Sequence, residues 1–112
     1  MDFVASLVIP QQLPFEELVE RVGELLRVRF IKDDSGRFEE FPAYVASVLG
    51  LEVAVLGIPA EEDLDEMDPV TEYGLLVRSV VEADDDSIET DLSCHLHFIL
   101  RAGGIECTIG NP

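Results

Sequence analysis

Acidic side chains crowd the second half of this sequence and restrict how it can fold. Thirteen carboxylates lie between Glu61 and Asp91, and Arg78 is the only basic residue among them. Because like charges repel, this density is costly to a compact state and predicts solvated surface. Two stretches have the composition of acidic loops, an eleven-residue one over Pro59–Pro69 and a shorter one over Ala83–Ser87. Long loops on a rigid frame often carry binding residues.

The net charge narrows the class of partner. The chain has 24 Asp and Glu against 7 Lys and Arg, which gives a formal charge of -17. A net negative charge of this size disfavours binding to nucleic acid or to an anionic membrane, and it favours binding to a basic partner. The simpler interpretation is that the acids keep a small protein soluble or reflect a salt-rich habitat.

Length and hydropathy predict one domain. The chain has 112 residues, of which 47% are hydrophobic, so it can bury a two-layer core and fold alone as a single domain over residues 1–112. The residues that follow Met1 lack the basic start of a secretory signal, and the longest apolar run, Leu51–Ile58, is too short to cross a bilayer. We therefore expect a cytoplasmic protein.

The apolar pattern predicts strands and an amphipathic helix. Phe3–Ile9 is apolar at nearly every position, as buried strands are, and Pro10 closes it. After Pro14, apolar residues recur at three- and four-residue steps from Phe15 to Leu26, which is the spacing of one helical face. Further strands are expected at about Val28–Ile31, Ala43–Val48, Leu51–Ile58, Tyr73–Val81 and Ile105–Ile109.

The segment Leu92–Ala102 fits two patterns. Its apolar residues alternate as in a strand, and they also fall on one face of a helix. Asp91 or Ser93 offers a helix N-cap, whereas the rival structure is a hairpin that turns after the segment. Arg101 suits a last turn and Gly103 a closing position, so we prefer a helix. The prediction is an α+β fold, a mostly antiparallel sheet of about five to six strands with two helices packed on one face.

The sequence offers no support for catalysis or a cofactor. One cluster has side chains of the metal-ligand type: Cys94, His95, His97 and Cys107. These residues do not gather at an accepted zinc spacing, and both cysteines are expected to be reduced core residues. Asp63, Asp65 and Asp68 lack the glycine and the closing glutamate of a calcium loop. We therefore predict no catalytic residue, no cofactor and no metal site, and we expect that the protein is not an enzyme.

Aromatic residues beside acids suggest a surface that binds a protein. Aromatic anchors ringed by carboxylates can occupy pockets of a basic partner, while long-range attraction speeds the encounter. The alternative is that these aromatic rings fill the core and the acids are merely solvated. The predicted partner-binding residues are Phe41, Tyr44, Glu61, Glu62, Asp63, Asp65, Glu66, Asp68, Tyr73, Asp84, Asp85 and Asp86.

Three stretches resemble small bacterial immunity proteins of polymorphic or contact-dependent growth-inhibition toxin systems. GRFEEFPAY at residues 36–44 and LEVAVLGIP at residues 51–59 look like the middle of such proteins, and residues 91–107 look like their end. The resemblance implies a cytoplasmic protein without catalysis that binds and blocks a cognate toxin domain, often a nuclease or another basic protein. It transfers no toxin identity and no binding residue. The alternatives are an acidic nucleic-acid mimic that inhibits a DNA-binding enzyme and, behind it, a small enzyme or ligand-binding domain.

Overall fold

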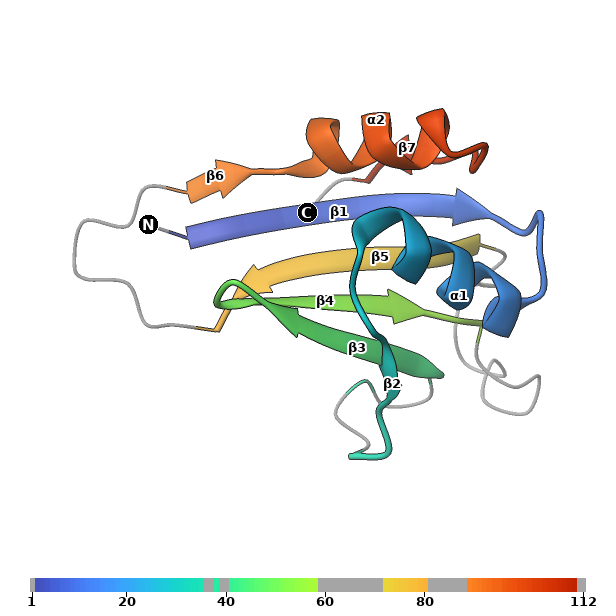
Figure 1. The fold of residues 1–112 in the computed structure, drawn as a ribbon, viewed down its shortest axis with the longest axis horizontal. Coiled ribbons are helices and arrows are strands. Elements are labelled where there is room, and N and C mark those ends of the chain that lie inside the picture. The colour runs from blue at the N-terminus through green and yellow to red at the C-terminus, as the bar shows by residue number, and fades with distance from the viewer. Residues whose placement is uncertain (1, 36–37, 39–40, 59–71, 81–88, 111–112) are drawn as a thin grey trace, which may run out of the picture.

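The computed structural model describes residues 2–35, 38, 41–58, 72–80 and 89–110, and it shows two helices with a sheet of seven strands (Figure 1). In chain order the elements are β1 (Asp2–Pro10), α1 (Phe15–Leu26), β2 (Ile31–Lys32), β3 (Ala43–Val48), β4 (Leu51–Leu56), β5 (Glu72–Ser79), β6 (Glu89–Asp91), α2 (Ser93–Ala102) and β7 (Thr108–Ile109). The predicted α+β class is confirmed, and the segment that fitted both patterns is a helix.

The sheet is built around β1. Its strand order is β2-β3-β4-β5-β1-β6, and β7 also pairs with β1. Strand β5 borders one edge of β1, whereas the other edge is shared by β6, at residues 2–4, and β7, at residues 7–8. Only β6 runs parallel to its partner; the other pairs are antiparallel. The prediction missed β6 because its three residues include two acids and show no apolar pattern.

The core lies on one face of this sheet. Leu7 of β1 pairs with Leu75 of β5, which pairs with Val55 of β4, and Tyr44 of β3 lies opposite Val55. The three aliphatic side chains are fully buried. Because side chains alternate along a strand, the register aligns apolar residues of four strands into one continuous inward face.

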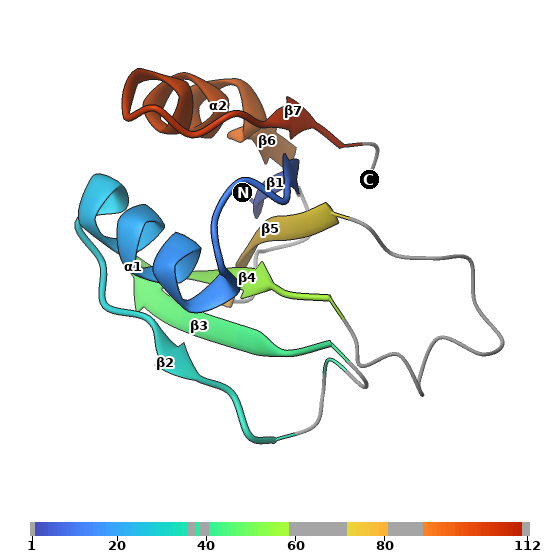
Figure 2. The same ribbon diagram turned by 90° about the vertical axis from the view of Figure 1, so that its right-hand side faces the viewer.

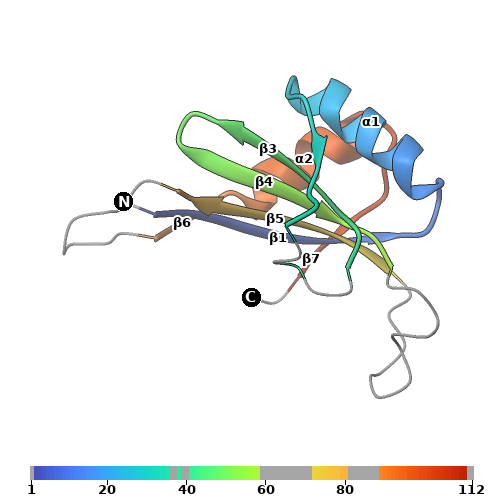
Figure 3. The same cartoon turned by 90° about the horizontal axis from the view of Figure 1, so that it is seen from below.

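Both helices add buried side chains to the same core cluster. Leu18 and Val22 come from α1, and Leu96 and Leu100 come from α2. Helix α2 runs beside β1 and contacts α1 (Figure 2), and α1 stands over the sheet when the molecule is seen from below (Figure 3). The apolar residues of each helix recur at helical spacing, so burying one stripe leaves the charged residues in solvent.

The start of α2 closes a gap along the edge of β1. Between the residues paired with β6 and β7, the Ser6 N–H donates to the hydroxyl oxygen of buried Ser93 at 3.0 Å, and the Ser6 carbonyl accepts the Gly110 N–H at 2.8 Å. Ser93 is the first residue of α2, and its own N–H donates to Asp91 Oδ1 at 2.8 Å. The predicted N-cap was one residue off, since Leu92 occupies the cap position and makes no side-chain capping bond.

The strand predicted at Val28–Ile31 is displaced to Ile31–Lys32. The reason is the end of α1, where Arg27 adopts a left-handed conformation with φ 59° and reverses the chain. The Val28 N–H then donates to the Gly23 carbonyl at 3.0 Å, which ties this segment to the helix instead of to β3. A backbone bond to a helix end replaces the sheet pairing that the alternating sequence suggested.

The Asp91 carboxylate should make the stability of the fold depend on pH. Hydrogen bonds from the hydroxyl and the N–H of Ser93 lower the pKa of Asp91 below 3.8. The folded state therefore favours the ionised form, so this stabilisation is fully present above the unfolded pKa and is lost as the pH falls through the folded pKa. We expect Asp91→Asn to melt below wild type at pH 7 and the gap to close as the pH is lowered into the acid range, as thermal melts at a series of pH values would show.

The control variant is Glu89→Gln, which removes a negative charge from the same strand, β6. It reports how much of the change follows from lower net charge alone. A melting gap between Asp91→Asn and wild type that stays constant at all pH values, after subtraction of the control, would refute the role of the carboxylate.

Candidate functional site

The two acidic loops of the sequence prediction lie outside the part of the chain that the structure describes. The predicted contact residues at these positions are Glu61, Glu62, Asp63, Asp65, Glu66, Asp68, Asp84, Asp85 and Asp86. The predicted residues with a described position are the aromatic ones, Phe41, Tyr44 and Tyr73.

Tyr73 is a core residue, so its prediction as an exposed anchor was wrong. Only 7% of its surface is exposed. Its hydroxyl donates to the Leu13 carbonyl oxygen at 3.0 Å, and its ring lies 5.5 Å from that of Phe15, centroid to centroid. The register of β5 places Tyr73 on the same face as Leu75 and Val77, and the neighbouring acid, Glu72, points the other way into solvent.

Phe41 and Tyr44 are half-buried. The Phe41 N–H donates to the Phe38 carbonyl at 3.1 Å. The Tyr44 ring packs edge-on against Phe15, with centroids 5.7 Å apart and an interplanar angle of 61°. One side of the Tyr44 ring therefore packs against the core, and the other side remains partly accessible to solvent.

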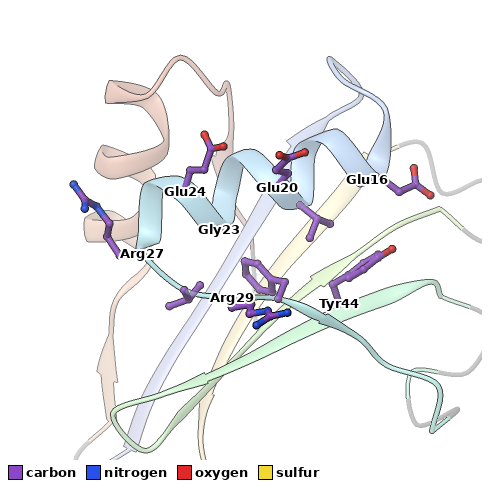
Figure 4. A pocket seen from close by; sticks show the side chains of 10 residues that line it. Glu16, Glu20, Gly23, Glu24, Arg27, Arg29 and Tyr44 are labelled. Carbon is purple, nitrogen blue, oxygen red and sulfur yellow. The ribbon is translucent and has the colours of Figure 1, made fainter.

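A groove lies between α1 and the segment that follows it, and Tyr44 lines one end of it (Figure 4). Its volume is about 690 Å³. Val19, Val28 and Phe30 give it apolar walls. Arg27 and Arg29 also line it. It is an open feature of the surface, formed where the chain turns back beside the helix.

Gly23 and Arg27 give this groove its shape. A Cβ at position 23 would lie 3.0 Å from the Val28 carbonyl oxygen and 3.4 Å from the Phe30 ring, so a larger residue would push the returning segment away from α1. The Arg27 N–H donates to the Gly23 carbonyl, as does the Val28 N–H. The groove thus depends on a glycine that admits close approach and on a left-handed residue that reverses the chain.

Three glutamates form an acidic row along this groove. Glu16, Glu20 and Glu24 are exposed residues of α1 that line it, and they follow one another along the helix in Figure 4. Residues four apart on a helix are neighbours about 6 Å apart along the axis. Like charges at this spacing destabilise a helix by a few tenths of a kcal/mol, or about 0.3 kcal/mol a pair. Glu16 lies in the first turn of α1, where the helix dipole favours a carboxylate, so the row costs the helix little.

The sequence contained a signal for this row that the prediction did not use. Glu16, Glu20 and Glu24 recur at a four-residue spacing in the sequence, and this repeat was not considered as a binding surface. Periodic acids on a short helix are common on solvated faces. Only the position of the Arg27–Phe30 segment shows that these carboxylates border a groove.

Among the described residues, the cysteines and the other side chains of the metal-ligand type do not come together in one site. Cys107 is buried, and burial raises the pKa of its thiol, whereas Cys94 is exposed on α2; the prediction that both lie in the core was right for Cys107 alone. Both thiols are free. Within the described ranges, no three His, Cys, Asp or Glu side chains gather as a metal site would need. Neither helix in the described part of the chain is long and apolar enough to span a membrane.

Comparisons with protein-family models, with curated proteins and with solved structures found no match to this chain. The groove combines apolar and aromatic walls with three carboxylates along α1 and two arginines, Arg27 and Arg29. Carboxylates beside apolar walls can accept basic and apolar side chains of a protein.

The role of Tyr73 can be tested by stability. Tyr73→Phe leaves the Leu13 carbonyl without its hydroxyl donor, which should cost about 1 kcal/mol, and Tyr73→Ala should cost about 3 to 5 kcal/mol because it empties a core site. Denaturant unfolding measures both changes. Tyr44→Phe is the matched control, since that ring borders the open groove. If Tyr73→Phe unfolds like wild type, the buried hydrogen bond does not stabilise the fold.

Proposed function

We propose that this protein is an immunity protein that binds and neutralises a cognate, basic bacterial toxin domain in the cytoplasm. The observation that carries the proposal is the acidic row of Glu16, Glu20 and Glu24 beside a groove with apolar and aromatic walls. The resemblance of three sequence stretches to immunity proteins supports the same function, and the net charge of -17 supports a basic partner.

The mechanism follows from how charge and apolar surface act at different distances. A strongly acidic protein attracts a basic one over about 10 Å at moderate salt, which raises the rate of encounter. The helix α1 then presents carboxylates to Lys or Arg, and the half-buried Tyr44 and Phe30 offer apolar contact within the groove. Neutralisation requires no chemistry of its own, because a bound inhibitor covers the basic surface with which a toxin holds its substrate.

The direct experiment is co-purification. The tagged protein is expressed together with the C-terminal domain of the secreted toxin encoded beside its gene. We expect a stable complex and loss of the toxicity of that domain in cells. Absence of a complex with the neighbouring toxin domain refutes the proposed function, and binding to a DNA-binding enzyme in its place would identify a nucleic-acid mimic.

The groove can be separated from the general acidity of the protein by two matched triple variants. Glu16→Gln, Glu20→Gln and Glu24→Gln together remove the acidic row. Glu72→Gln, Glu89→Gln and Glu106→Gln remove the same charge from exposed positions on other parts of the chain. We expect the first variant to weaken the complex about tenfold, or about 1.4 kcal/mol, and the second to change it little. Isothermal titration calorimetry measures both, and equal effects would show that the groove has no special role.

The association rate should depend on salt. If long-range attraction guides the encounter, raising the ionic strength from about 0.01 M to 0.15 M shortens the screening length from about 30 Å to 8 Å and slows association steeply, while dissociation changes less. Surface plasmon resonance at a series of salt concentrations measures both rates. An association rate that is unchanged across the series would remove electrostatic attraction from the proposal.

A further inference from the structure

The turn between β3 and β4 contains a residue that does not suit it. Val48 and Leu51 form the last pair of the two strands, so Leu49 and Gly50 are the two residues of the turn. Both have positive φ, 51° at Leu49 and 75° at Gly50. This is the combination of a type I′ turn, which favours Asn-Gly because asparagine tolerates the left-handed region and leucine does not.

Folding does not bury the Leu49 side chain. Its side chain is 93% exposed, the highest value among the exposed large hydrophobic residues of the described chain. A leucine in this position therefore combines an unfavourable backbone conformation with an apolar side chain left in water. Residues with an unfavourable backbone conformation that no contact in the fold offsets concentrate at functional sites.

The neighbours of Leu49 extend the apolar surface at this end of the sheet. Val80, which is 51% exposed, donates its N–H to the Gly50 carbonyl at 2.9 Å and so lies against the turn. Val48 and Leu51 are half-buried behind it. Figure 1 shows the turn at the end of the β3–β4 hairpin, beside the end of β5. We call Leu49 with Val80 the hairpin tip.

The charge of the protein decides what can cover this tip. Two copies would each bring a charge of -17, so self-association is opposed by repulsion, and an anionic membrane is opposed for the same reason. A basic protein is attracted. The tip lies five residues along β3 from Tyr44 of the groove, about 17 Å at the rise of a strand. An interface of ordinary size, about 800 Å² on each partner, can cover both.

We propose that Leu49 is an apolar anchor that inserts into an apolar pocket of the basic toxin domain, as a contact separate from the groove. This inference rests on the proposed function and names a second contact with the same partner. It explains why the turn carries leucine: the residue is unfavourable in the free protein and becomes buried in the complex. A side chain that fills a desolvated pocket near the centre of an interface contributes to affinity, and leucine does so less often than Trp, Tyr or Arg.

The test uses a variant that improves the fold and removes the anchor. Leu49→Asn supplies the preferred turn residue, so we expect its melting temperature to rise by about 2 to 4 °C. The same variant should bind the neighbouring toxin domain at least about tenfold more weakly in calorimetry. Leu49→Met keeps apolar bulk and should bind like wild type. Phe98→Gln is the control, because it removes another exposed apolar side chain, 71% exposed on α2, from a different element.

Each outcome separates this inference from the proposed function. If wild type does not bind the toxin domain, the proposed function is refuted, and so is the toxin domain as the partner of Leu49. If wild type and Leu49→Asn bind equally, the anchor is refuted and the proposed function stands. A melting temperature that falls in Leu49→Asn refutes the conflict between the leucine and its turn. A wild type that sediments as a dimer, with Leu49→Asn a monomer, identifies a second copy as the occupant and also overturns the inference.

Discussion

The pairing of β1 with β5, β6 and β7, which all come from the second half of the chain, is the interaction on which the rest of the structure depends. One edge of β1 pairs with β5, and the other edge pairs with β6 and β7 from the C-terminal region. Its inward side chains Ala5, Leu7 and Ile9 are buried in the middle of the core cluster. Since an open strand edge exposes unpaired backbone groups, the tail from β6 to β7 protects β1 and encloses its apolar side chains at once.

This arrangement allows a highly acidic chain to remain folded. Burial of aliphatic side chains on one face of the sheet stabilises the fold, and charge repulsion opposes it. Helix α1 shows the division on a small scale, because Leu18 and Val22 lie in the core while Glu16, Glu20 and Glu24 remain in solvent. The cost of the acidic row is small for the helix, and the row places three carboxylates beside the groove.

Two residues in left-handed backbone conformations shape the surface in different ways. Arg27 ends α1 and turns the chain back, which forms the groove. Leu49 begins the turn from β3 to β4 and stands in solvent. The left-handed conformation of Arg27 is offset by a hydrogen bond, because the Arg27 N–H donates to the Gly23 carbonyl. In the second case the free protein shows no such contact, within the described residues, for the Leu49 side chain, which is 93% exposed.

The sequence by itself determined the elements whose apolar pattern is local. β1, α1 and the β3–β4 hairpin follow from periodicity and from Pro10 or Gly50 at their ends, because burial of one face is encoded within each segment. The apolar pattern of α2 fitted a strand as well, and signals at the ends of the segment favoured the helix. Tertiary structure decided the rest. Strand β6 pairs because β1 offers it an edge, and Tyr73 is buried because the register of β5 turns it inward. The glutamates of α1 border a groove because the left-handed Arg27 turns the next residues back beside the helix. These outcomes depend on which edges and faces meet in space, and no residue pattern within one segment records that.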